Sequence, residues 1–132
     1  MGKRSTARRL AMQVLFQLDA GQNDLDFLLE QSARRERLIA DTVRFAGELA
    51  NGARGHLAEL DKYIAEKSIG WSLTRITGVD RAILRLAVYE IRFLRTPPSV
   101  AINEAVELAK KFSTAESAKF VNGILGGLAE KK

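Results

Sequence analysis

The chain has 132 residues, of which 46% are hydrophobic and 28% charged, a balance that predicts one domain with a buried core. It contains no cysteine and one histidine, which excludes disulfides, a thiol nucleophile, cysteine-ligated zinc and a multi-histidine metal site. The formal net charge is +5, and residues 1–10 carry basic side chains but no acidic one. A basic end on a small domain favours a polyanionic partner, most often nucleic acid.

No apolar run reaches the ~20 residues that a membrane-spanning helix needs. No stretch has the composition of a secretory signal peptide. The lack of cysteine fits a reducing compartment. We therefore expect a cytoplasmic protein that does not bind a membrane.

Residues 4–19 have apolar side chains at helical spacing and predict the first helix. Arg4 and Arg8 are four residues apart beside the apolar face, have no evident structural role, and can reach one target together. Gln13 and Phe16 lie off the centre of that face.

Residues 24–50 predict two further helices. Asp24 can cap a short helix that ends at about Gln31, and a longer helix follows Ser32 and continues through Ala50. Asn51 and Gly52 are expected to end it, since both tolerate positive φ. Three arginines fall near the start of this longer helix, where the dipole disfavours cations, and we interpret them as a solvated patch: Arg34, Arg35 and Arg37.

A fourth helix is predicted over residues 56–67, and His56 is interpreted as a helix-start residue, not as a ligand. Residues 68–70 form a break. Trp71 follows the break and is interpreted as a core anchor, not as a stacking platform. Residues 72–77 can form one short turn.

The stretch from Val79 to Leu94 is apolar nearly all round, which is typical of a buried helix, so we expect it at the centre of the fold. Thr77 can cap it, with Asp80 three residues later. Its arginines fall within roughly an 80° sector. That stripe is either a solvated edge or a surface that meets an anion; its members are Arg81, Arg85, Arg92 and Arg95.

Two more helices complete the chain. Pro97 and Pro98 end the central helix, and Ser99 opens a helix that extends to Phe112. Ser113 and Glu116 match a capping box, and the last helix runs from there to about residue 128. Because no strand pattern appears, we predict an all-α fold of about seven helices. It forms a single domain over residues 1–132, with subdomains of about 1–68 and 69–132.

The chain has no pattern that carries known chemistry. It lacks a P-loop, a GxGxxG turn and an HExxH helix, and its serine, histidine and acidic residues have no recognised catalytic spacing. We therefore expect no enzymatic activity, no cofactor and no metal. The residues alone predict a basic, all-α binding domain.

Four segments nevertheless resemble one family. They are INEAVELAK at 102–110, KFVNGIL at 119–125, VDRAILRLAVYE at 79–90 and RRLAMQVLF at 8–16. Together they are similar to the NusB family of bacterial transcription antitermination factors, in the same order and over nearly the whole chain. The resemblance implies two helical bundles side by side. It also implies pairing with NusE, a small-subunit ribosomal protein.

In that family the pair binds boxA, a short single-stranded element of nascent ribosomal RNA leaders, and joins other Nus factors on RNA polymerase. Some members form homodimers that hide the RNA surface. Carried onto this chain, the RNA-binding residues would be Lys3, Arg4, Arg8, Gln13, Glu116, Lys119 and Phe120. Phe16 and Asp80 would contact NusE.

Several of these residues have an alternative interpretation. Phe120 can equally be a core residue, and Glu116 can serve its cap as well as RNA. Three polar residues of the matching segments look like groups that join helices, and not like ligands: Asn103, Glu104 and Asn122.

The chain departs from the family pattern at Ser5 and Thr6, which interrupt the basic run, so RNA affinity without the partner is expected to be weak. The segment after Leu125 is short and rich in glycine. The competing hypothesis is a helical protein-interaction module without RNA binding. A NusB-like domain fused to a ribosomal RNA methyltransferase does not fit, because the chain has no room for the enzyme.

Overall fold

The computed structural model describes residues 2–68 and 76–130, and within them the chain forms seven helices and no strand. They are α1 (Lys3–Asp19), α2 (Leu25–Glu36), α3 (Ala40–Gly55), α4 (Leu57–Lys67), α5 (Gly78–Phe93), α6 (Pro98–Phe112) and α7 (Ala115–Glu130). The predicted all-α fold is confirmed. Trp71 and most of the turn predicted over 72–77 lie outside the described residues, and the division at residue 69 stays a prediction.

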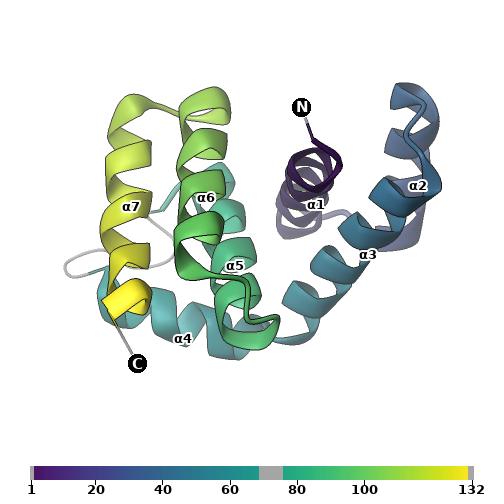
Figure 1. The fold of residues 1–132 in the computed structure, drawn as a ribbon. Coiled ribbons are helices and arrows are strands. Elements are labelled where there is room, and N and C mark those ends of the chain that lie inside the picture. The colour runs from purple at the N-terminus through teal and green to yellow at the C-terminus, as the bar shows by residue number, and fades with distance from the viewer. Residues whose placement is uncertain (1, 69–75, 131–132) are drawn as a thin grey trace.

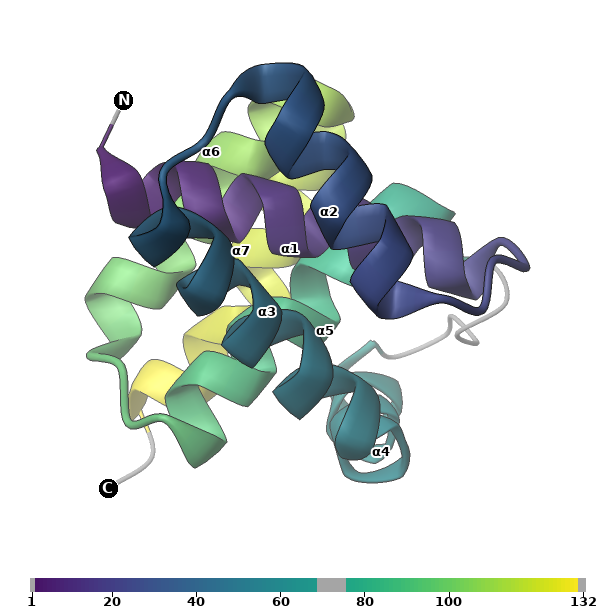
Figure 2. The ribbon, with the colours of Figure 1, turned by 90° about the vertical axis from the view of Figure 1, so that its right-hand side faces the viewer.

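The helices form two bundles side by side (Figure 1). Helices α1, α2 and α3 make one bundle, α5, α6 and α7 make the other, and α4 crosses below them. In Figure 2, which faces α2 and α3, α1 runs behind both of them. Helix α1 also packs against α5 and α6, so it lies where the two bundles meet.

The central helix is α5, as its composition predicted. It packs against α1, α3, α4, α6 and α7, and its apolar side chains from Ala82 to Tyr89 are buried. Burial of the larger ones, such as Ile83, Leu84 and Leu86, contributes roughly 1.5–3 kcal/mol each. Thr77 caps the helix, because its Oγ1 accepts a hydrogen bond from the Asp80 amide over 3.3 Å.

The boundary between the second and third helices was predicted wrongly. Helix α2 continues to Glu36, and the chain reverses at Arg37, which has a left-handed φ of 54°. The Leu38 amide then donates to the Ala33 carbonyl over 3.0 Å, which is the bond that closes a Schellman turn. Arg34 and Arg35 therefore lie in the last turn of a helix, where the dipole favours cations, and not near a helix start.

Gly52 was expected to stop its helix, yet α3 continues to Gly55. The reason for the glycine is packing. A Cβ added at Gly52 would overlap the hydroxyl and ring of Tyr89, so only glycine lets α5 approach α3 this closely. Tyr89 is in turn part of a ring cluster, lying 5.6 Å from Phe93 and 5.8 Å from His56 between ring centroids.

The last two helices begin close to their predicted positions. Helix α6 starts at Pro98, since proline suits the first helical position. Helix α7 is capped by Thr114 and not by Ser113: the Thr114 Oγ1 accepts from the Ser117 amide over 2.9 Å. Across residues 2–68 and 76–130, none of the helices combines the length and the hydropathy needed to cross a membrane.

Candidate nucleic-acid interface

Two shallow hollows lie along α6. One separates α6 from α1 and has a volume of about 470 Å³; the other separates α6 from α7 and has a volume of about 510 Å³. Both are lined by Asn103 and Lys110, so they adjoin along one face of α6. We call the two hollows together the α6 groove. Its basic lining residues are Arg9, Lys110, Lys111 and Lys119.

The lysines of the groove are open to solvent. The Lys119 side chain is 79% exposed, and its nearest acid is Glu116 at 4.0 Å. Lys110 lies 3.5 Å from Glu107, also at the surface. Ion pairs of this kind contribute little, so their cations stay available to an external anion. The Glu116 side chain points to solvent and takes no part in the cap for which it was predicted.

Arg9 connects the groove to the first bundle. Its Nη1 donates to Gln13 over 2.9 Å, and its Nη2 is paired with Glu36 at 2.5 Å. The hydrogen bond from Arg9 lowers the pKa of the Glu36 carboxyl below its ordinary value, against an opposing effect of burial. The predicted site residue Gln13 is therefore held by a basic side chain that lines the groove.

Arg4 faces the other side of α1. With Lys3 it lines a hollow of about 230 Å³ between α1 and α3, and its guanidinium lies 4.4 Å from the centroid of the Phe45 ring. Arg8 approaches the same ring at 5.8 Å. Arg4 and Arg8 were predicted to reach one target together, and in the structure both approach the same side chain of this chain, Phe45. Both Lys3 and Arg4 remain exposed.

Arg8 has a structural role that the sequence did not reveal. Its side chain is buried, with 5% of the residue exposed, against Glu90, of which 2% is exposed. Nε and Nη2 donate to the Glu90 carboxylate over 2.9–3.0 Å. Nη1 lies 3.4 Å from Oε1 of Glu104, which also accepts from the Ser5 hydroxyl over 2.6 Å. The prediction that Arg8 lacks a structural role is wrong: it ties α1 to both α5 and α6.

Glu104 joins helices, as predicted, but Asn103 and Asn122 do not. Both asparagines are exposed, both line the hollow between α6 and α7, and neither side chain makes a hydrogen bond within the described part of the chain. Phe120, on α7, is partly buried against the core.

Phe16 packs against the start of α5, the helix that carries Asp80. The Phe16 ring rests on Gly78, where an added Cβ would lie 2.9 Å from its Cε1. Asp80 follows two residues later, is buried, and leaves its Oδ1 without a hydrogen-bond partner among the described residues. Phe16 is partly exposed. Phe16 therefore offers an exposed apolar ring to a partner, whereas the unpaired oxygen of Asp80 is enclosed within the fold.

Two arginines of the α5 stripe, Arg81 and Arg85, pair with carboxylates of the same chain. Arg81 pairs with Asp19 at 2.6 Å, and Arg85 pairs with Asp19 at 3.2 Å and with Asp61 at 2.7 Å. These pairs join α5 to the end of α1 and to α4. Arg95 lies beyond the end of α5 and is exposed, with a left-handed φ of 57°.

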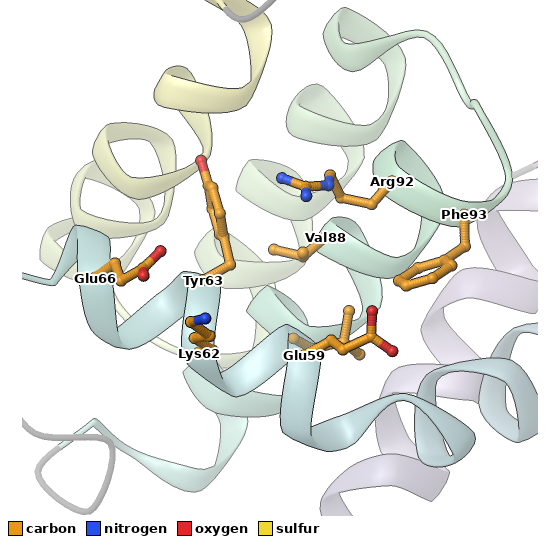
Figure 3. A pocket seen from close by; sticks show the side chains of 8 residues that line it. Glu59, Lys62, Tyr63, Glu66, Val88, Arg92 and Phe93 are labelled. Atoms are coloured by element: carbon orange, nitrogen blue, oxygen red, sulfur yellow. The ribbon is translucent and has the colours of Figure 1, made fainter.

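Arg92 lines a fourth hollow, of about 310 Å³, between α4 and α5 (Figure 3). Its guanidinium lies 5.8 Å from the centroid of the Tyr63 ring. Acidic and basic side chains alternate around this hollow; they are Glu59, Glu66, Lys62 and Arg92. Its acids and bases are equal in number, whereas the basic residues that line the α6 groove outnumber its acids, Glu104 and Glu107, so the α6 groove is the better site for a polyanion.

In residues 2–68 and 76–130, no group of three or more histidine, cysteine or acidic side chains converges to hold a metal ion. His56 lies between α3 and α4, with its Nδ1 2.9 Å from the Gly52 carbonyl oxygen and its ring 4.1 Å from that of Phe93. It is a packed residue at a helix junction, as predicted.

Sequence reasoning missed Arg9, Lys110, Lys111 and Asn103 as groove residues. A signal was present for the two lysines, since they fall in the last turn of α6, but that position has a dipole explanation of its own. For Arg9, only the fold brings the start of α1 beside the end of α6.

Comparison with known proteins agrees with this geometry. The model of the NusB family matches residues 5–130. The transcription antitermination protein NusB of Symbiobacterium thermophilum is 48% identical over 134 residues, covering 95% of this chain and 88% of that protein.

Among solved structures, NusB of T. maritima superposes with a TM-score of 0.88 at 36% identity, covering 97% of this chain and 91% of that one. A crystal structure of the antitermination factors NusB and NusE in complex with double-stranded RNA has a TM-score of 0.88 at 29% identity, covering 97% of this chain and 96% of that one. On the family match and these identities, the chain belongs to the NusB family.

Proposed function

We propose that this protein is a transcription antitermination factor that binds boxA single-stranded RNA together with NusE. In this function it joins other Nus factors on RNA polymerase and suppresses premature termination in ribosomal RNA leaders. The observation that carries the proposal is the α6 groove, where exposed lysines from two helices line a surface beside Arg9 of α1. The relative whose solved complex contains NusE and RNA supports it.

The RNA would follow the groove and the start of α1. Single-stranded RNA requires cations along its phosphates and side chains that contact unstacked bases. Lys3, Arg4 and Lys119 are exposed and can approach phosphates. Phe120 is partly buried, so its open edge is what would meet a base. Gln13 and Glu116 complete the proposed RNA-binding set, and Arg8 acts on it by holding α1 in place.

NusE would bind at the opposite end of α1, where Phe16 lies on Gly78 beside Asp80. The Phe16 ring would become buried against NusE, and the enclosed Oδ1 of Asp80 would meet a donor of NusE only after the start of α5 shifts. The RNA site would extend along α1 from Lys3 to Gln13 and the partner site would begin at Phe16, so a rigid α1 would fix one site relative to the other.

We further propose that the protein acts without enzymatic activity and in the cytoplasm. Relatives carry the name of transcription antitermination proteins, a regulatory function that needs binding and no chemistry of its own. A homodimer that covers the groove would compete with RNA. Sedimentation of the protein with and without boxA-like RNA tests this, and a dimer that persists when RNA is bound would contradict it.

The test of the function is a fluorescence anisotropy titration with a labelled boxA-like RNA. It is repeated with a scrambled RNA and with the same sequence as a duplex, each with and without NusE. We expect NusE to tighten binding to the single-stranded boxA-like RNA more than to the other two. Equal, salt-sensitive binding to all three would support only a basic helical domain. No RNA binding, with NusE still bound, would support the protein-interaction module.

A further inference from the structure

The hollow between α6 and α7 contains two amide side chains that the fold does not use. Asn103 projects from α6 and Asn122 from α7, and both line this one hollow. Neither makes a hydrogen bond among the described residues. Asn51 behaves in the ordinary way for an exposed asparagine of a helix: its Nδ2 donates to the Gly47 carbonyl over 2.9 Å.

The rest of the lining completes a site for a flat ring. Apolar side chains of both helices face the hollow, with Ile102 and Val106 on α6 and Ala118 on α7. Small residues on α7 leave the volume of about 510 Å³, which is within the usual range for a ligand site. Lys110 and Lys119 also line it, so cations stand beside the apolar surface and the amides.

Each part matches one part of a nucleotide. Apolar surface accepts the face of an unstacked base, lysine accepts a phosphate as a point charge, and an amide offers a donor and an acceptor side by side. An asparagine amide is complementary to the adjacent N6–H donor and N7 acceptor of adenine. Guanine is instead matched by arginine or lysine.

From this juxtaposition we infer that the α6–α7 hollow is a base-reading subsite, in which Asn103 and Asn122 hydrogen-bond the edge of one unstacked adenine. The inference rests on the proposed RNA-binding function and adds to it the residues that set sequence preference. The lysines of the groove supply affinity for any RNA strand, whereas the two amides distinguish one base from another.

The experiment measures the ratio of affinities for a boxA-like and a scrambled RNA, with NusE present. The variants are Asn103→Ala, Asn122→Ala and the double variant, and Asn51→Ala is the matched control. A good bidentate pair discriminates by about 5- to 150-fold, so we expect the ratio to fall by that factor in the double variant. The salt slope should stay unchanged, since no phosphate contact is removed. Asn51→Ala should leave both quantities unchanged.

A second arm identifies the base. Each adenine of the boxA-like RNA is replaced in turn by 7-deazaadenine, which lacks the N7 acceptor. One replacement should weaken binding to the wild-type protein and have no effect on the double asparagine variant. If the asparagine variants lose affinity but no adenine position shows this difference between the wild type and the double variant, the assignment of adenine is wrong.

The outcomes separate the inference from the proposed function. A selective wild type whose asparagine variants keep the full ratio would overturn the inference and leave the function standing. Equal loss of affinity for both RNAs would also overturn it, because the amides would then act without regard to sequence. If the wild-type protein did not prefer the boxA-like RNA, both the inference and the proposed function would be wrong.

Discussion

The basic side chains of this protein form two populations. Arg8, Arg81 and Arg85 lie between helices and are each bound by carboxylates of the same chain. Lys3, Arg4, Lys110 and Lys119 lie at the surface, where acids are distant or solvated. The guanidinium fork suits fixed bidentate pairs inside the fold, and the lysine ammonium remains hydrated at the surface. A basic sequence therefore does not by itself say which cations meet RNA.

Of the substitutions that test this distinction between buried and surface cations, replacing Glu90 should have the largest effect on stability. Glu90→Gln would remove the main counter-charge of the buried Arg8 and leave only the more distant Glu104; breaking a buried pair costs about 3–5 kcal/mol, and we expect a loss toward the lower end. Urea unfolding followed by circular dichroism measures the loss. Glu107→Gln, on the exposed face of α6, should change the free energy of unfolding by less than about 0.5 kcal/mol. Equal stability of the two variants would mean that Arg8 is not held as described.

Acidification should weaken the ion pairs of Asp19 with Arg81 and Arg85, with a smaller loss of stability than Glu90→Gln causes. Burial raises the pKa of the Asp19 carboxyl, but hydrogen bonds and charges of Arg81 and Arg85 outweigh it and hold this pKa below its ordinary 3.8. Because the pKa is lower in the folded state, the ionised Asp19 stabilises the fold at neutral pH. This stabilisation disappears as the pH falls through the folded value.

We therefore expect the melting temperature to fall from about pH 5 downward, and Asp19→Asn to lose less on acidification than the wild type. Asp26→Asn removes an exposed carboxylate that forms no ion pair among the described residues, and serves as the control. A wild type and an Asp19→Asn variant with parallel melting curves against pH would contradict the role given to this pair.

Replacing the surface cations should have the opposite effect, with little change in stability and a clear change in RNA binding. Arg4→Ala and Lys119→Ala should each change stability by less than about 1 kcal/mol, since Arg4 loses only an exposed contact to Phe45 and Lys119 a distant pair. Each should lower the salt slope of RNA binding by about 0.7, the value for one phosphate contact on a single strand. The Glu90→Gln variant should keep the salt slope of the wild type even if its RNA affinity is lower, because it removes no contact to a phosphate. A slope unaltered by Arg4→Ala would remove Arg4 from the RNA site.

The helices were predictable because their signals are local. The apolar run of 79–94 and the cap at Thr77 lie within one stretch of sequence, and both are found in the structure. The turn at Arg37 was missed because it has no glycine or proline, and its left-handed residue is an arginine. Gly52 was misassigned because its reason is a contact with Tyr89, which no local pattern reveals.

The site was less predictable, and for the same reason. Lys3, Lys119 and the others came from resemblance to a family and not from spacing. Arg4 and Arg8 look equivalent on a helical wheel, yet Arg8 has a partner 82 residues away and Arg4 faces α3. The groove itself joins α1 with α6 and α6 with α7, so its residues converge only after folding.

The pair of Arg8 and Glu90 also bears on how the chain folds while it is being made. At a synthesis rate of about 5–20 residues per second, Arg8 leaves the peptidyl transferase centre roughly 4–16 seconds before Glu90 exists, given the 82 residues between them. During that time α1 has neither its counter-charge nor the apolar surface of α5 to cover it. We therefore expect the side of α1 that packs on α5 to stay uncovered until α5 is made, so that a nascent chain that stalls before α5 exposes apolar surface to chaperones.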